Sequence, residues 1–436
     1  MMAASRSRAR WLKFLGPKLG LAKALRTLAV DPDDFDLHHV FPVVTSLPGL
    51  LGDPREFEPR AGGAAITLEG AINRAMGELL ERYASFAYEG ANPTVASYTE
   101  MIERGHRPVT LGYLIRFSPE QYRQKRFPYV ELTKATRVDW VEGTNLLDGQ
   151  PTYVPGQLVL FGSGQSSESV APCFYATSSG CALATSVEEA VLKGILELIE
   201  RDAVMIRWYA RLAPPRLDVN PADLLPECIG SQAKALEIRL HDLTVDGEVP
   251  VAGATCIERT GRPCFFLLSA GCALDISTAA SKALVEAGQG RPFIKSMAGN
   301  SPVPTEDAGF NDFDSNVRFF GEPSNAKYAE WFVQNPNLSA RNVTTPLQAK
   351  TPVESLSILL DRCADMGITP IALNLTTPEL HDTGLFACRV FAPELAPLGI
   401  PSAPFLGHPR LARFIASSKA ARIAATVPDW VPHPFP

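Results

Sequence analysis

Two segments of the chain carry acidic residues at a spacing that could hold a metal ion. The segments GAINRAMGELLERY (70–83) and EAVLKGILELIERD (189–202) align without a gap. Both contain Glu-x-x-Glu-Arg, formed by Glu78, Glu81 and Arg82 and by Glu197, Glu200 and Arg201. A third segment, ASKALVEAGQGR (280–291), repeats the theme with Glu286, Gln289 and Arg291. Residues three apart share one helix face, so each pair directs two carboxylates at the same neighbour.

The remaining positions of these segments are mostly Ala, Leu, Ile and Val, which indicates helices that are largely buried. Burying paired carboxylates without a cation is costly enough that they would protonate or move. The repeat therefore indicates a bound cation, and carboxylate oxygens suit Mg²⁺ held together with substrate phosphates. The alternative is a solvated helix face that carries Glu–Arg ion pairs. This explanation fits a single isolated Glu-x-x-Glu-Arg motif better than three aligned ones.

The chain lacks the glycine-rich loops that usually hold nucleotide phosphates. It has neither GxxxxGK[ST] nor a GxGxxG before a lysine-bearing strand. A bound nucleotide would therefore be held by metal–carboxylate bridges and by arginines. The segment SSGCALATSVEEA (178–190) runs small and hydroxyl residues into a helix N-terminus, where backbone N–H groups favour an anion.

The acidic segments belong to a pattern of alternating helices and strands. Helices are predicted over 67–87, 186–210, 277–291 and 350–366, and strands over 263–270, 369–376 and 385–393. This pattern predicts an α+β or α/β architecture, and it does not fix the strand order.

The composition is that of a globular enzyme. The 436 residues are 46% hydrophobic and 20% charged, and a net charge of −6 with a pI near 5.8 argues against a nucleic-acid-binding protein. No run of about 18 apolar residues could span a membrane and no signal peptide is recognisable, so a cytoplasmic location is expected. The eight cysteines form no Cys-x-x-Cys pair and are expected to be buried thiols rather than zinc ligands.

The N-terminal region is basic. Residues 1–30 contain seven basic residues and no acidic one, with apolar residues between them, and an acidic cluster over 31–36 ends the pattern. One interpretation is an amphipathic arm that docks a partner protein or an acidic leader peptide. The other is a solvated, partly disordered extension, since chain ends are usually loose. Either way, residues 1–40 are predicted to be a basic N-terminal extension.

Taken together, these segments resemble the YcaO family. Members of that family carry an ExxER helix, an S-x-G…EA…ExxER block and an ExxQxR block, in the order found here. The resemblance covers roughly residues 60–436 and implies a YcaO-type α+β fold of mixed sheets and helices, with a catalytic domain over 41–436. It implies that the phosphates of ATP are bridged by Mg²⁺ ions bound to Glu78, Glu81, Glu197 and Glu200. It also implies a nucleotide site lined by Ser179, Glu189, Arg201, Glu286, Gln289 and Arg291.

The chain departs from the family pattern at two places near the expected nucleotide site. Members often have a lysine in a glycine-rich stretch before the first acidic helix, where this chain reads Arg60-Ala-Gly-Gly. Either Arg60 replaces that lysine or the contact comes from elsewhere. Residues 182–185 (Ala-Leu-Ala-Thr) lack an asparagine and a glycine that are common in the family's loop.

The chain ends in Pro432-His-Pro-Phe-Pro436, three prolines at alternate positions. Prolines stiffen the chain and lower the entropy lost when it becomes ordered. The ending resembles that of azoline-forming members, which implies that the tail and the carboxylate of Pro436 reach the active site, with that carboxylate as the catalytic base. Members that form thioamides generally lack such an ending. As a chain end, the tail is expected to contribute little to the hydrophobic core.

The resemblance implies a cyclodehydratase that converts Cys, Ser or Thr residues of a ribosomally made precursor peptide into thiazolines or oxazolines. It also implies a ThiF-like or leader-recognition partner protein and an FMN-dependent dehydrogenase that oxidises the rings. Two alternatives stay open. One is thioamide or amidine formation at the same ATP site, and the other is a non-catalytic scaffold that binds peptide and holds structural metal.

Overall fold

The computed structural model describes residues 10–46, 49, 60–87, 93–161, 170–229, 236–247, 249–258, 266–297, 313–333, 341–342, 351–417, 428 and 431–435. Arg6 and Arg8 of the basic region and the terminal Pro436 lie outside these ranges.

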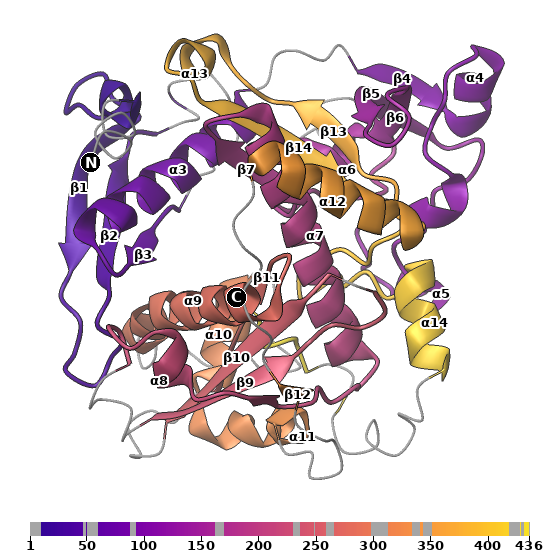
Figure 1. The fold of residues 1–436 in the computed structure, drawn as a ribbon. Coiled ribbons are helices and arrows are strands. Elements are labelled where there is room, and N and C mark those ends of the chain that lie inside the picture. Colours follow the sequence, from indigo (N-terminus) through magenta and orange to yellow (C-terminus); the bar gives the residue numbers. More distant parts are fainter. Residues whose placement is uncertain are drawn as a thin grey trace.

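Antiparallel sheets form the frame of the described part of the chain (Figure 1). The largest has the order β4-β5-β13-β14-β7, with β6 paired to β5, and its strands are β4 (Thr94–Ser97), β5 (Arg137–Asn145), β6 (Pro151–Pro155), β7 (Cys181–Ala184), β13 (Ile371–Asn374) and β14 (Phe386–Phe391). A second sheet joins β9 (Leu236–Asp242), β10 (Val251–Glu258) and β11 (Phe266–Cys272). The N-terminal sheet joins β1 (Ala22–Leu28), β2 (His38–Val44) and β3 (Gly63–Ala65). A short parallel pair joins β8 (Leu217–Asp218) and β12 (Arg341–Asn342).

Four long helices pack on these sheets: α3 (Leu68–Phe86), α7 (Val187–Tyr209), α9 (Ile276–Met297) and α12 (Pro352–Asp365). The shorter ones are α4 (Tyr98–Glu103), α5 (Pro119–Tyr122), α6 (Gly156–Val159), α8 (Pro221–Leu224), α10 (Phe313–Phe320), α11 (Glu330–Val333), α13 (Pro378–Asp382) and α14 (Pro409–Ser417), with 3-10 turns η1 (Leu12–Phe14), η2 (Leu111–Leu114) and η4 (Pro323–Tyr328). All four predicted helices and all three predicted strands are present, with bounds shifted by a few residues. The α+β class is confirmed.

Each acidic helix follows directly after a strand, so α3, α7 and α9 begin in equivalent strand-to-helix turns. Thr67 caps α3 by accepting a hydrogen bond from a first-turn N–H at 3.1 Å, and Ser186 caps α7 in the same way at 3.2 Å. The carboxylate of Asp275 accepts from the first turn of α9 at 2.8 Å. Oxygen-bearing side chains suit this position because they satisfy free N–H groups of the first turn. The sequence of each turn therefore fixes where its acidic helix begins.

Helix α7 runs through the centre of the molecule and joins the six-stranded sheet to the sheet of β9, β10 and β11 (Figure 1). It packs against β7 and β14 of one sheet and against β10 and β11 of the other. Its buried residues, including Ile195, Val204 and Trp208, belong to the main hydrophobic core. Helix α3 packs on β2, β3 and β7, while α9 packs on β10 and β11 and reaches β3. The three acidic helices thus tie the sheets together. Among the described helices, none is long and apolar enough to cross a membrane.

The described part of the basic N-terminal region is folded into the body of the molecule. Trp11 and Phe14 are buried in a core that also contains residues of α3, and the Trp11 indole N–H donates to Asn73 at 2.8 Å. The predicted boundary after residue 40 falls inside β2. Residues 10–44 are therefore not a loose extension, because the apolar residues between the basic ones supply a face that can be buried.

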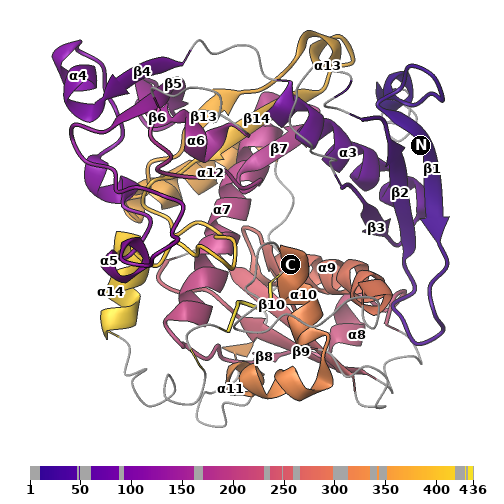
Figure 2. The same cartoon turned by 180° about the vertical axis from the view of Figure 1, so that it is seen from behind.

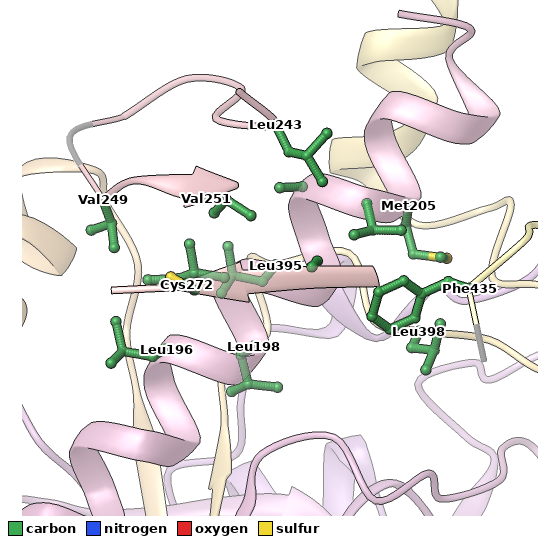
Figure 3. Packing of buried hydrophobic residues seen from close by; sticks show 14 of the residues in the cluster. Leu196, Leu198, Met205, Leu243, Val249, Val251, Cys272, Leu395, Leu398 and Phe435 are labelled. Atoms are coloured by element: carbon green, nitrogen blue, oxygen red, sulfur yellow. The ribbon is translucent and has the colours of Figure 1, made fainter. Parts of the chain in front are cut away.

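The end of the chain is buried in the middle of the molecule. Residues 431–435 are all buried, and Phe435 belongs to the main core, where its ring lies beside Leu398 (Figure 3). His433 is fully buried, and its Nε2 is hydrogen-bonded to the Gly399 carbonyl at 3.1 Å. The prediction that the tail contributes little to the core is therefore wrong. A segment stiffened by prolines loses little entropy on ordering, so burial of its apolar side chains is favourable.

Candidate functional site

Five carboxylates from three helices meet between α3, α7 and α9. Glu78 and Glu81 come from α3, Glu197 and Glu200 from α7, and Glu286 from α9. These groups are close enough to affect one another's ionisation, since the charge of Glu197 helps to raise the pKa of the carboxyls on all three helices. The structure therefore brings together the four predicted metal ligands and one predicted nucleotide-site residue.

The first glutamate of each Glu-x-x-Glu pair is held by equivalent contacts. Glu78 accepts from the N–H of Gly62 at 2.9 Å, and Glu197 accepts from the N–H of Gly180 at 3.2 Å. Both glycines stand immediately before the strand that leads into the acidic helix. Each glutamate also pairs with the arginine four residues along its helix, at 2.7 Å in α3 and at 3.3 Å in α7. The repeat in the sequence is thus a repeat in three dimensions.

Gly180 is required by its surroundings. Its φ of +84° is in the left-handed region, and a Cβ at this position would lie 2.3 Å from the carbonyl oxygen of Val390. The N–H that holds Glu197 can therefore be presented only by glycine. This accounts for the glycine of the Ser-Gly motif.

The second glutamate of each pair is less well compensated. Burial raises the pKa of Glu81 well above its usual range, and the charges of two neighbouring glutamates raise it further. Burial raises the pKa of Glu200 to about 7 against the opposing charge of Arg201. Burial also raises the pKa of Glu286. Among the described residues, the ion pairs at this cluster include neither Glu81 nor Glu286.

These properties fit a bound divalent cation. Carboxylates that raise one another's pKa in a buried setting lack positive charge, and a cation among them would restore their ionised forms. The oxygen-only set of ligands suits Mg²⁺, which usually keeps coordination positions for the phosphates of a substrate. The residues present can therefore hold Mg²⁺ together with a nucleotide.

Three further predicted nucleotide-site residues lie in or near the turns around the acidic helices. Ser179 is buried in the loop before β7, next to the glycine that holds Glu197. Glu189, in the first turn of α7, pairs with Lys193 at 2.9 Å. Gln289 joins α9 to β3 by accepting from the N–H of Ala64 at 3.1 Å. Their contacts with a nucleotide stay a prediction.

Arg291 has a different set of neighbours. Its guanidinium is fully buried and pairs with Asp33 at 3.0 Å and with Asp34, while Lys295, one turn later on α9, pairs with Asp31 at 2.9 Å. The three aspartates have carboxylate oxygens within 4.8 Å of one another, and these two cations offset their charge. Arg291 thus holds the loop between β1 and β2 against α9. Its predicted place in the nucleotide site stays a prediction.

The C-terminal segment reaches the second acidic helix. The ring of Phe435 lies 4.5 Å from the guanidinium carbon of Arg201, a cation–π contact. In Figures 1 and 2 the C-terminal segment lies beside α9 in the interior of the molecule. Pro436 lies outside the described residues, so the role of its carboxylate stays a prediction. Arg60, the candidate replacement for the family's lysine, is largely exposed and pairs with Asp314 of α10.

Arg389 is a buried arginine near the carboxylate cluster that the sequence pattern did not reveal. It donates to the carbonyl of Thr177 at 2.6 Å, to that of Leu158 at 3.1 Å, and to the sulfur of Cys181 at 3.0 Å. Its charge acts to lower the pKa of Glu81. No spacing along the chain could have shown this, because the Thr177 contact joins residues 212 positions apart.

The fold and the carboxylate cluster are those of a protein that binds Mg²⁺ together with a nucleotide. A model of the YcaO cyclodehydratase family, described as ATP- and Mg²⁺-binding, matches residues 62–396. The chain therefore belongs to the YcaO family, as its motifs predicted. Family membership also confirms the prediction of ATP and Mg²⁺ as cofactors.

Two relatives share part of the sequence. An uncharacterized protein from Methanothermobacter thermautotrophicus is 28% identical over 162 residues, which cover 36% of this chain and 42% of the relative. An uncharacterized protein in the tfuA 3′ region of Rhizobium leguminosarum bv. trifolii is 28% identical over 251 residues, which cover 55% of this chain and 56% of the relative. The chain thus spans about half the length of the relatives that it matches.

Several solved structures share the fold. A heterocyclase in complex with substrate and cofactor has a TM-score of 0.77 at 17% identity, covering 99% of this chain and 57% of its own. YcaO from Methanopyrus kandleri bound with AMPPCP and Mg²⁺ has a TM-score of 0.62 at 20% identity, and the match covers 91% of this chain and 90% of that one. The E. coli microcin synthetase McbBCD complex with pro-MccB17 has a TM-score of 0.61 at 13% identity, and the match covers 94% of this chain and 96% of the matched chain. The YcaO-type fold is confirmed.

Proposed function

We propose that this protein is an ATP-dependent cyclodehydratase that forms thiazolines or oxazolines in a ribosomally synthesised precursor peptide. The observation that carries the proposal is the cluster of five carboxylates lying beside a buried, proline-rich chain end, because Phe435 contacts Arg201 of the second acidic helix. The similar structures support a peptide substrate, since one is a heterocyclase with substrate and another a microcin synthetase with pro-MccB17.

The proposed reaction has three steps. The side chain of a Cys, Ser or Thr in the peptide loses its proton to a base and adds to the preceding backbone carbonyl carbon, giving a hemiorthoamide. The oxygen of that intermediate takes a phosphoryl group from ATP, and ADP leaves. The C–O bond then breaks, phosphate leaves, and loss of the amide proton gives the C=N bond of the ring. Mg²⁺, when bound, offsets the negative charge on the transferring phosphoryl group.

The residues of the chain supply binding, orientation and a base. Glu78 and Glu197 are fixed in advance by a glycine N–H and an arginine each, so little reorganisation is needed when ligands bind. The contact with Arg201 places Phe435 beside the second acidic helix. We propose that the carboxylate of Pro436 takes the proton of the nucleophile, which requires it to lie within hydrogen-bond reach.

We infer that the protein works with partners. A ThiF-like or leader-recognition protein would bring the precursor peptide, and an FMN-dependent dehydrogenase would oxidise azolines to azoles. The microcin synthetase with the same fold is a complex, which supports this inference. The use of ATP and the seven free, buried cysteines among the described residues support a reducing, cytoplasmic location.

The test uses the purified chain with its partner, the precursor peptide, ATP and Mg²⁺. We expect ADP to form in step with the loss of one water mass from the peptide per ring. Glu200→Gln should abolish both readouts, and Glu103→Gln, a change at an exposed residue of α4, should leave them intact. ADP formation without loss of water, or a peptide that gains sulfur, would contradict azoline formation. A complex that binds peptide without consuming ATP would indicate a scaffold.

A further inference from the structure

A small, partly open cavity is lined by the loop that carries Ser179. Its volume is about 30 Å³, which exceeds the roughly 10–15 Å³ that a single water requires. Its polar lining consists of Arg116, Arg389, Tyr175, Thr177 and Ser179. The rest of the lining is apolar and comes from α6, α7, β14 and the loops that follow β14. A cavity with two arginines and three hydroxyls is unlike the dry voids of a hydrophobic core.

Arg116 is a buried cation that forms no ion pair with any of the described residues. Its side chain is 1% exposed, and within the described part of the chain its Nε and Nη1 atoms have no hydrogen-bond partner. Its guanidinium lies 5.6 Å from the ring of Phe391 and 5.9 Å from that of Phe405. Burial lowers the pKa of Arg116 to about 9, so the group still carries its proton at neutral pH. A buried charge without a partner is strongly unfavourable unless something supplies the opposite charge.

Arg389 adds a second positive charge to the same cavity. It is 3% exposed, and its Nη1 and Nη2 donate to carbonyl oxygens and a thiol rather than to a carboxylate. Its Nε atom has no hydrogen-bond partner in the part of the chain that the structure describes. The hydroxyls of Thr177 and Ser179 lie 3.2 Å apart on the same wall, where each can turn to donate to a ligand.

We propose that this cavity binds a small oxyanion of the phosphate class between Arg116 and Arg389. Guanidinium groups match such anions because they donate through a planar fork, and the aromatic and aliphatic walls keep competing water away. The cavity is distinct from the carboxylate cluster, where negative charge repels a free anion. The two sites nevertheless share one loop, since Ser179 lines the cavity and the next residue, Gly180, holds Glu197. The proposal does not depend on the chemistry proposed above.

The test is phosphate binding to the full chain in EDTA, without nucleotide, so that the carboxylate cluster cannot hold phosphate through a metal. Inorganic phosphate is titrated at constant ionic strength, and the thermal unfolding midpoint is recorded alongside calorimetric binding. We expect a saturable rise in the midpoint with a stoichiometry of one. Arg116→Met should lose this response, yet in phosphate-free buffer it should unfold at the same or a higher temperature, because it removes an uncompensated charge.

Matched variants separate this site from other causes. Arg123→Met removes an exposed arginine of the neighbouring segment and should keep the full response. Arg389→Lys keeps the charge but loses the fork, and its apparent phosphate affinity should fall at least tenfold. An unchanged midpoint in the wild type would overturn the proposal, as would a response that persists in Arg116→Met. If acetate raised the midpoint and phosphate did not, the proposal that the ligand is a phosphate-class anion would be overturned, and the cavity would be assigned to a peptide carboxylate.

Discussion

At the scale of single residues, the two glutamates of each acidic pair are held differently and should respond differently to substitution. Glu197→Gln and Glu200→Gln should each lower ATP-dependent turnover by more than about a hundredfold, because each removes a ligand charge from the Mg²⁺ site. Only Glu197→Gln weakens the contact with the Gly180 N–H, and it also weakens the closer of the two glutamate contacts with Arg201, at a cost of about 1 kcal/mol in stability. Steady-state kinetics and denaturant unfolding measure the two effects. Wild-type turnover in either variant would contradict the assignment of the site.

The pKa shifts of the same residues predict how stability depends on pH. The pKa of Glu200 rises from 4.5 to about 7 on folding, and that of Glu81 also rises. The folded state thus binds more protons than the unfolded state in this range, so stability is present below pH 4.5 and is lost as the pH rises toward 7. In EDTA, the unfolding midpoint of the wild type should fall between pH 5 and pH 7. Glu200→Gln should reduce this slope, and Mg²⁺ with ATP should remove it, since protons and metal compete for the same oxygens. A flat profile in EDTA would contradict the prediction.

Arg291 tests whether a residue of the family motif acts on the nucleotide or on the fold. Arg291→Met leaves Asp34, whose side chain is 2% exposed, without its buried partner. Loss of one member of such a pair typically costs about 3–5 kcal/mol. We expect a large fall in the midpoint of denaturant unfolding and an unchanged KM for ATP in the fraction that stays folded. Lys295→Met is the control: Lys295 also contacts Asp34, at 3.0 Å, but its side chain is 20% exposed, so its loss should cost less than that of the fully buried Arg291. A higher KM with intact stability would restore the nucleotide role.

At the scale of elements, the C-terminal segment both packs in the core and contacts Arg201 of the second acidic helix. Phe435→Ala should destabilise the fold by about 3–5 kcal/mol, because the ring is buried in the main core. Adding two residues after Pro436 should leave the thermal midpoint nearly unchanged, because it removes no buried side chain. It should lower the rate of ring formation on the order of a hundredfold, as expected when a catalytic group is displaced by about 1 Å. Native rates in the extended chain would refute a catalytic role for the terminal carboxylate.

At the scale of the whole molecule, the predictions that held depended on local signals. The acidic helices were predictable because their glutamates repeat at i and i+3, and their starts because Thr67 and Ser186 cap them. The pairing of Arg291 with Asp33 joins residues 258 positions apart, and nothing in either segment identifies the other. The burial of residues 431–435 likewise depends on a place in the core that only the assembled sheets and α7 create. Spacing along the chain predicted which glutamates share a helix face but not the contacts that support them.

The described part of the basic N-terminal region combines buried apolar residues with exposed basic ones, and this changes how its role is best tested. Deleting it would remove β1 and the buried Trp11, so any loss of binding could reflect unfolding. Lys13, Lys18, Lys23 and Arg26 are all exposed, and replacing these four with Gln removes charge without touching the core.

If these basic residues dock an acidic partner or leader peptide, the variant with all four substitutions should bind it about tenfold more weakly than the wild type at low salt. The ratio of the two dissociation constants should approach one near 0.5 M salt, where charges are screened within a few ångströms. Its thermal midpoint should match that of the wild type, because exposed substitutions change stability little. The matched control replaces Arg123, Lys125, Arg126 and Lys134, which are equally exposed on other elements, and should bind as the wild type does. Titration by calorimetry at several salt concentrations decides the matter. Equal affinity of the two variants at low salt would leave β1 and its basic residues with a structural role alone.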